Sequence, residues 1–83
     1  MYNAKYTICS LSARTSKCEC TVDGYDNVDV LKSDTANIIE DMIESYKIPD
    51  GIANIEMLIE HDGEYVDCDS GDFMIESGKF KII

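Results

Sequence analysis

Hydrophobic and polar residues alternate along several short segments of this chain, as they do in strands that bury one face. The segments AKYTICSL (4–11) and KCECTV (17–22) alternate in this way and are joined by the polar stretch SARTS. They predict a first β-hairpin. With Ile8 opposite Cys20, the apolar face of that hairpin consists of Tyr6, Ile8, Cys18, Cys20 and Val22.

One segment instead has its apolar residues at helical spacing, DTANIIEDMIESYK (34–47). The buried stripe of this helix is expected to consist of Ile39, Met42, Ile43 and Tyr46. Three acids lie away from the stripe, namely Glu40, Asp41 and Glu44.

Local signals predict where this helix begins and ends. Ser33 or Asp34 can cap its first turn, and the turn-forming IPDG (48–51) follows its last. The preceding passage, DGYDNVDVLKSD (23–34), is rich in turn residues, and we expect Val28 and Val30 to form a short extended piece.

After the helix the alternation returns and predicts an antiparallel meander. ANIEMLIE (53–60) is the first strand of this meander, and Asp62-Gly63 is a two-residue turn of the kind that hairpins prefer. A four-residue loop, Asp69 to Asp72, and a turn at Ser77-Gly78 follow. The expected pairs are Ile59 with Val66, Met57 with Cys68, Cys68 with Phe73, Val66 with Ile75, Ile75 with Phe80 and Phe73 with Ile82.

All these registers keep the apolar residues on one face, and a slip of one residue would lose that agreement. The order is therefore a β-hairpin, one α-helix and a β-meander. We expect an α+β fold in which an antiparallel sheet carries the helix on its apolar face. A β-grasp arrangement is the alternative, because a hairpin, a helix and further strands also describe it.

Length and composition limit the architecture to one small domain. The chain has 83 residues, and 45% of them are hydrophobic, which is enough for a single core over 1–83. No apolar run approaches the roughly 20 residues that a transmembrane helix needs, and the N-terminus lacks the pattern of a secretory signal. We therefore expect a cytoplasmic, intracellular protein.

The distribution of charge points to a partner. The net charge is −10, but residues 1–33 are neutral overall, whereas residues 34–76 hold thirteen acids and the single base Lys47. Such a surface disfavours direct contact with nucleic acid or with an anionic membrane, and it favours a basic protein.

The densest acidic stretch is EHDGEYVDCDSGD (60–72). The registers above turn one set of residues outward together on the sheet: Glu56, Leu58, Glu60, Tyr65, Asp67, Asp69, Met74 and Glu76. Further acids extend this array at the loops (Asp62, Glu64 and Asp72). Glu40, Asp41 and Glu44 add a ridge on the helix, whose place relative to the sheet face the sequence leaves open. Like charges held this closely cost stability, which favours a binding role over a face that is only solvated.

Metal binding and catalysis fit the acidic stretch less well. An EF-hand loop counted from Asp67 has Gly71 at its fifth position and lacks a glutamate at its twelfth. Catalysis by paired carboxylates needs a sheltered pocket, and the only histidine, His61, lies beside a turn. We therefore expect no metal, no cofactor and no enzymatic activity.

The four cysteines, Cys9, Cys18, Cys20 and Cys68, lie in segments that resemble strands. The C-x-C spacing of Cys18 and Cys20 differs from that of structural zinc and iron–sulfur sites. We expect reduced thiols, with a disulfide or a small metal or redox site as the alternatives.

These observations favour an inhibitor that occupies the basic, nucleic-acid-binding surface of another protein. In size and composition the chain resembles the small acidic inhibitors that phages and mobile elements encode against restriction and CRISPR machinery, some of which mimic nucleic acid. No sequence motif carries this resemblance. The alternative is an adaptor module of the β-grasp type, which would bind a protein through a sheet edge or through Leu58, Tyr65 and Met74.

Overall fold

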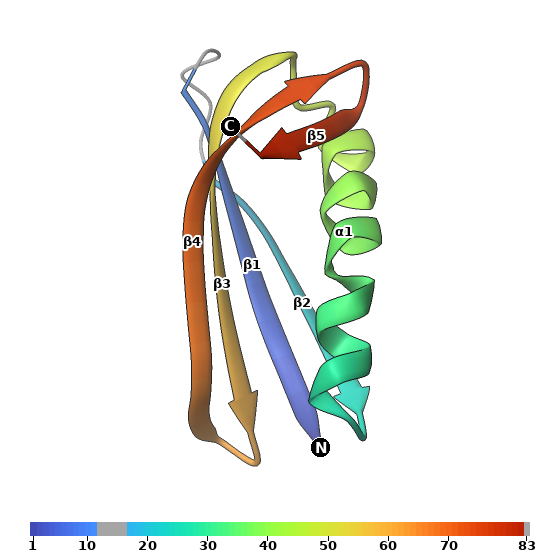
Figure 1. Ribbon diagram of the computed structural model, residues 1–83, viewed down its shortest axis with the longest axis vertical. Coiled ribbons are helices and arrows are strands. Elements are labelled where there is room, and N and C mark those ends of the chain that lie inside the picture. Colours follow the sequence, from blue (N-terminus) through green and yellow to red (C-terminus); the bar gives the residue numbers. More distant parts are fainter. Residues whose placement is uncertain (12–16, 83) are drawn as a thin grey trace.

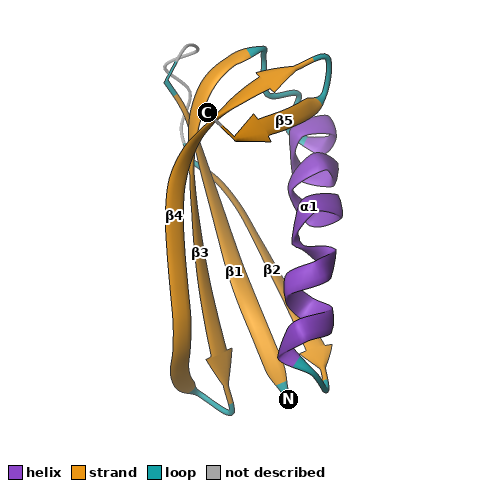
Figure 2. Cartoon of the chain, viewed as in Figure 1, coloured by secondary structure: helices purple, strands orange, loops and turns teal. Residues whose placement is uncertain are grey.

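The computed structural model describes residues 1–11 and 17–82 and contains one antiparallel sheet and one helix (Figure 1, Figure 2). The elements are β1 (Tyr2–Ser10), β2 (Cys18–Tyr25), α1 (Val28–Ser45), β3 (Gly51–His61), β4 (Glu64–Glu76) and β5 (Lys79–Ile82). The order across the sheet is β2-β1-β3-β4-β5. The expected connection SARTS, at 12–16, lies outside the described residues.

The helix α1 packs on one face of the sheet, where it contacts β1 and β2. The last part of β4 bends across the molecule, so that β5 lies beside the C-terminal end of the helix (Figure 1). This arrangement confirms the predicted α+β fold, with a hairpin, one helix and further antiparallel strands in a curled sheet. The central strands β1 and β3 are antiparallel, so the β-grasp alternative, which needs a parallel central pair, is wrong.

The core lies between α1 and the sheet face that it covers. The sheet contributes Ala4, Tyr6, Ile8, Ala53, Ile59, Phe73 and Ile75, and the helix contributes Leu31, Ile39, Met42 and Ile43. Burying a large apolar side chain stabilises a fold by about 1.5–3 kcal/mol, so this stripe holds the helix in place. Of the predicted helix stripe, Tyr46 is wrong, because it lies at the C-cap and is 51% exposed.

The helix begins at Val28, well before the predicted start at Asp34. Asn27 caps it, because its side-chain oxygen accepts a hydrogen bond from the N–H of Asp29 at 2.7 Å. The predicted cap at Ser33 or Asp34 and the extended piece at Val28 and Val30 are therefore wrong. Leu31 is fully buried, and its burial together with the cap outweighs the weak preference of valine for strands.

The first hairpin has the predicted apolar face but a different register. Ile8 lies opposite Cys18 and Tyr6 lies opposite Cys20, which is two residues away from the expected pairing. A shift of two residues leaves every side chain on its original face. Strand β2 also continues past the predicted Val22 to Tyr25, whose hydroxyl donates to Asp34 on α1 at 2.9 Å.

Strand β4 differs most from the prediction. The turn at Asp62-Gly63 is confirmed, since His61 pairs with Glu64 and Glu60 with Tyr65. The register then shifts at a β-bulge, so that Ile59 pairs with Asp67 instead of Val66. The strand continues without the predicted loop at Asp69–Asp72. Three further predicted pairs are therefore wrong as well, namely Met57 with Cys68, Cys68 with Phe73 and Val66 with Ile75.

The bulge is what brings Phe73 and Ile75 into the core. Without an extra residue at Val66, the two-residue turn would place Phe73 opposite Ile52, on the face turned away from α1. With it, Phe73 lies opposite Ala53 and is buried. The last turn, at Ser77-Gly78, follows the prediction, and it pairs Ile75 with Phe80 and Phe73 with Ile82.

Candidate protein-binding surface

The face of the sheet that is turned away from α1, here called the outer face, carries part of the predicted array. Its predicted members are Glu56, Leu58, Glu60, Tyr65, Asp72, Met74 and Glu76. Lysines neutralise some of the charge on this face. Lys5 lies 3.6 Å from Glu19, and Lys81 lies 3.7 Å from Glu76.

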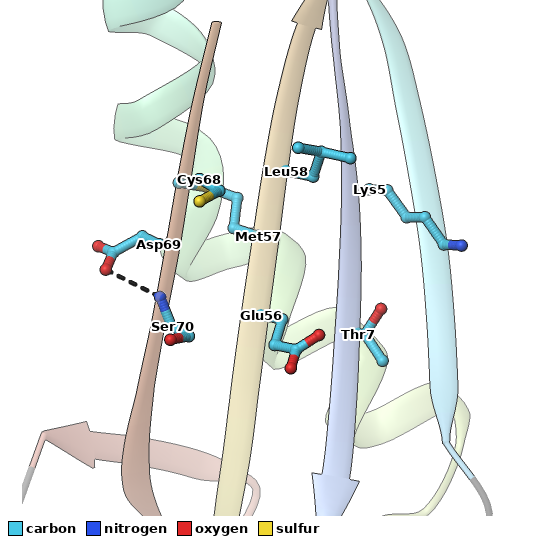
Figure 3. Close-up of a pocket in the computed structure, with 8 residues that line it drawn as sticks. All are labelled: Lys5, Thr7, Glu56, Met57, Leu58, Cys68, Asp69 and Ser70. Atoms are coloured by element: carbon cyan, nitrogen blue, oxygen red, sulfur yellow. Dashed lines mark hydrogen bonds between the residues drawn. The ribbon is translucent and has the colours of Figure 1, made fainter. Parts of the chain in front are cut away.

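The outer face has a hollow of about 600 Å³ between β1, β3 and β4. It is lined by Lys5, Thr7, Glu56, Met57, Leu58, Cys68, Asp69 and Ser70 (Figure 3). Charges of both signs lie among uncharged side chains there. The hollow therefore suits contact with a polar surface better than it suits proton or group transfer.

The side chains of Asp67 and Asp69 are turned away from the outer face, contrary to the prediction, although Asp69 also borders the hollow. The two residues pair with Ile59 and Met57, whose side chains point towards α1, because the bulge reverses the alternation of β4. Lys32 of the helix approaches Asp67 at 3.3 Å. The carboxylate of Asp69 lies on the side of β4 away from β3 and accepts from the N–H of Ser70 at 2.9 Å (Figure 3).

Asp62 and Glu64 lie at the turn between β3 and β4, at one end of the sheet. The terminal amino group hydrogen-bonds to Asp62 at 2.9 Å. This hydrogen bond, and then the positive charge of the amino group, lower the pKa of the Asp62 carboxyl. Asp62 is therefore already neutralised in part by the protein's own chain.

The helix acids Glu40, Asp41 and Glu44 lie in the other layer of the molecule, on α1. Glu40 meets Lys79 of β5 at 3.4 Å. Since α1 covers the inner face of the sheet, these carboxylates and the outer-face acids point to different sides. The ridge on the helix, whose place the sequence left open, is therefore not part of the array on the sheet.

A series of carboxylates does follow β4, although they do not all face away from β3. Asp69 does so (Figure 3), whereas Asp72 accepts a hydrogen bond from the side-chain amide of Asn54 on β3 at 3.0 Å. We call this series the acidic edge, and it consists of Glu64, Asp67, Asp69 and Asp72. At 3.3 Å per residue it spans roughly 26 Å, which is most of the molecule's 35 Å length. Within the described residues only Asp67 of this group has a lysine partner. The sequence alone does not reveal this edge, because its pattern predicts a loop at Asp69–Asp72.

The three apolar candidates do not form one patch, and Leu58 is partly buried, contrary to the prediction that it is exposed. Tyr65 and Met74 are nine positions apart on β4, or roughly 30 Å, and Met74 pairs instead with exposed Ile52. Tyr65 is 63% exposed, and its hydroxyl donates to the Cys68 sulfur at 3.1 Å. That hydrogen bond raises the pKa of the Tyr65 hydroxyl.

The four cysteines form no disulfide; Cys9, Cys18 and Cys20 are partly buried, and Cys68 is exposed. Burial is the main cause that raises the pKa of the Cys18 thiol. Over residues 1–11 and 17–82, no three His, Cys, Asp or Glu side chains gather closely enough to hold a metal ion.

No helix in the described part of the chain is both long and apolar enough to cross a membrane. Comparisons with protein-family models, with curated proteins and with solved structures give no match to this chain.

Proposed function

We propose that this protein binds a basic partner protein and covers the surface with which that partner contacts nucleic acid. The observation that carries the proposal is the excess of carboxylates. Residues 34–76 hold thirteen acids and one base, and the few ion pairs leave most of these acids without a cation in the described residues. A cationic surface would relieve that repulsion on binding.

The acidic edge is the best candidate for the contact. A nucleic-acid strand carries about one charge per 3.4 Å of helix axis, whereas the acidic edge carries four carboxylates over roughly 26 Å. The edge therefore matches the sign of a nucleic acid and not the spacing of its phosphates. Binding would block the partner by covering its basic groove, without a step of chemistry.

The experiment begins with the partner that the tagged protein captures at low salt from the cells that produce it. The partner's affinity for its nucleic acid is then measured with and without this protein. We expect the two ligands to compete. Simultaneous binding of both ligands would contradict the proposal.

Matched variants locate the contact. Asp69→Lys with Asp72→Lys should weaken partner binding by at least about tenfold, because both charges lie on the acidic edge. Asp41→Lys with Glu44→Lys makes the same change in net charge on α1 and should weaken it much less. A larger loss from Tyr65→Ala than from the edge variant would favour an apolar adaptor contact instead.

A further inference from the structure

Strand β4 has a main-chain edge that no other strand covers. On one side it pairs with β3 over nearly its whole length, from Glu64 to Ile75. On its other side β5 pairs only with Phe73–Glu76. Over Glu64–Asp72, therefore, no described strand lies beside β4 on the side away from β3. Unpaired strand edges of this length are templates for the addition of another strand.

An apolar groove of about 330 Å³ runs beside this edge, between α1 and the half of the sheet that the helix leaves uncovered. Its apolar lining consists of Ile39 from the helix, Ile55 and Met57 from β3, and Phe73 and Phe80 from the β4–β5 hairpin. Four consecutive residues of β4 line it as well, Asp69, Ser70, Gly71 and Asp72. A strand added to β4 would turn every second side chain towards this groove.

The position of β5 shows where such a strand would lie. β5 occupies the outer side of β4 at Phe73–Glu76 and has its last described residue, Ile82, opposite Phe73. An added strand would continue that line along Glu64–Asp72. One backbone donor of this edge, the N–H of Ser70, already donates to the carboxylate of Asp69. A carbonyl of the incoming strand can replace that carboxylate as the acceptor.

The charges on the edge select the occupant. Asp67 and Asp69 lie on the groove side of β4, and Asp72 on its outer face. A second copy of this chain, paired through the same edge, would bring these carboxylates against one another, and like charges opposite each other destabilise a strand pair. An extended segment with lysine or arginine beside an apolar residue matches both the charge and the groove.

We propose that Glu64–Asp72 of β4 is a strand-addition site for an extended basic segment of a partner protein. One apolar side chain of that segment enters the groove beside Gly71, and flanking basic side chains meet Asp67 and Asp69. This inference rests on the proposed function for the basic character of the partner. It adds the mode of binding, which is main-chain pairing along β4.

A synthetic peptide tests the proposal directly. In the peptide, threonine alternates with lysine, except for one leucine at its centre, so that leucine and the lysines share one face in either strand direction. N-methylation along one edge prevents the peptide from pairing with itself. We expect it to bind the intact protein and to slow hydrogen exchange of the amides in Glu64–Asp72. A control peptide that is N-methylated along both edges should not bind.

Two leucine variants, one on β4 and one on α1, form a matched pair. A side chain at Gly71 would meet nothing within 4 Å, and the backbone there is not left-handed, so Gly71→Leu should fold and fill the groove. It should weaken peptide binding by at least about tenfold. Ser45→Leu adds the same side chain at an exposed position on the side of α1 that faces β2, outside the groove, and should leave the affinity within about twofold.

Several outcomes would overturn strand addition. One is absence of binding, another is equal binding of the fully methylated peptide, and a third is equal affinity of the two leucine variants. Protection of amides elsewhere, with binding that still weakens as salt rises, would reject strand addition and leave the proposed function standing. If Asp67→Asn with Asp69→Asn self-associates and the peptide does not bind, the acids serve only to prevent edge pairing.

Discussion

Tyr6 shows how one side chain joins the sheet to the helix. It is fully buried, and its hydroxyl lies 2.9 Å from the hydroxyl of Thr35 on α1. Thr35 in turn donates to the carbonyl of Leu31 at 3.2 Å. Burial raises the pKa of the Tyr6 hydroxyl, and the hydrogen bond to Thr35 offsets only part of that rise.

Tyr6→Phe should lower the free energy of unfolding by about 1 kcal/mol at neutral pH, because one hydrogen bond is lost while Thr35 keeps its acceptor. The folded-state pKa of Tyr6 is raised, so the wild-type protein keeps this stability below the ordinary tyrosine pKa of about 10 and loses it as the pH rises further. Urea unfolding at neutral and alkaline pH checks this. An unchanged difference between the two proteins would contradict it.

The N-cap of α1 is a second place where a single residue has a large effect, here on the start of the helix. Asn27→Ala should destabilise the protein by about 1 kcal/mol, because it removes the acceptor for the N–H of Asp29. Ser33→Ala should cost much less, since Ser33 is exposed and donates only to the carbonyl of Val30 within the helix. Thermal unfolding compares the two, and equal losses would show that Asn27 is not the effective cap.

The bulge at Val66 determines which face of β4 enters the core. Deleting Val66 should turn Phe73 and Ile75 away from α1 and cost several kcal/mol, since truncating a single buried phenylalanine typically costs about 3–5. Val66→Ala should have a small effect, because Val66 is 43% exposed. Guanidinium unfolding measures both. A deletion variant that is as stable as Val66→Ala would show that the bulge does not set the register.

The hydrophobic pattern predicted β1, β2, β3 and β5, two of the three turns of the meander and the inner faces of β1 and β3, but it divided β4 into two strands. It could not predict the bulge, because a valine at 66 suits a core position equally well in either register. It also missed the start of α1, because Val28 and Val30 favour strands locally and only the burial of Leu31 against the sheet reverses that preference.

At the scale of the molecule, the amount of charge can be read from the sequence, but the placement of that charge cannot. One extra residue in β4 moved Asp67 and Asp69 to the helix side, and the helix acids lie in the other layer. A register error of one residue reverses every later side chain of a strand. The total charge could therefore be predicted from the sequence, whereas the face of the sheet that carries each carboxylate could not.

The salt dependence of partner binding tests the central claim most directly. We would measure the dissociation constant from about 0.05 to 0.3 M salt. Within this range the Debye length, over which salt screens a charge, falls through about 8–10 Å. The wild-type protein should lose affinity steeply as salt rises. Asp69→Asn with Asp72→Asn should flatten that dependence, while Asp41→Asn with Glu44→Gln should leave it nearly unchanged. Affinity that does not depend on salt, or equal slopes for the two variants, would contradict binding through the acidic edge.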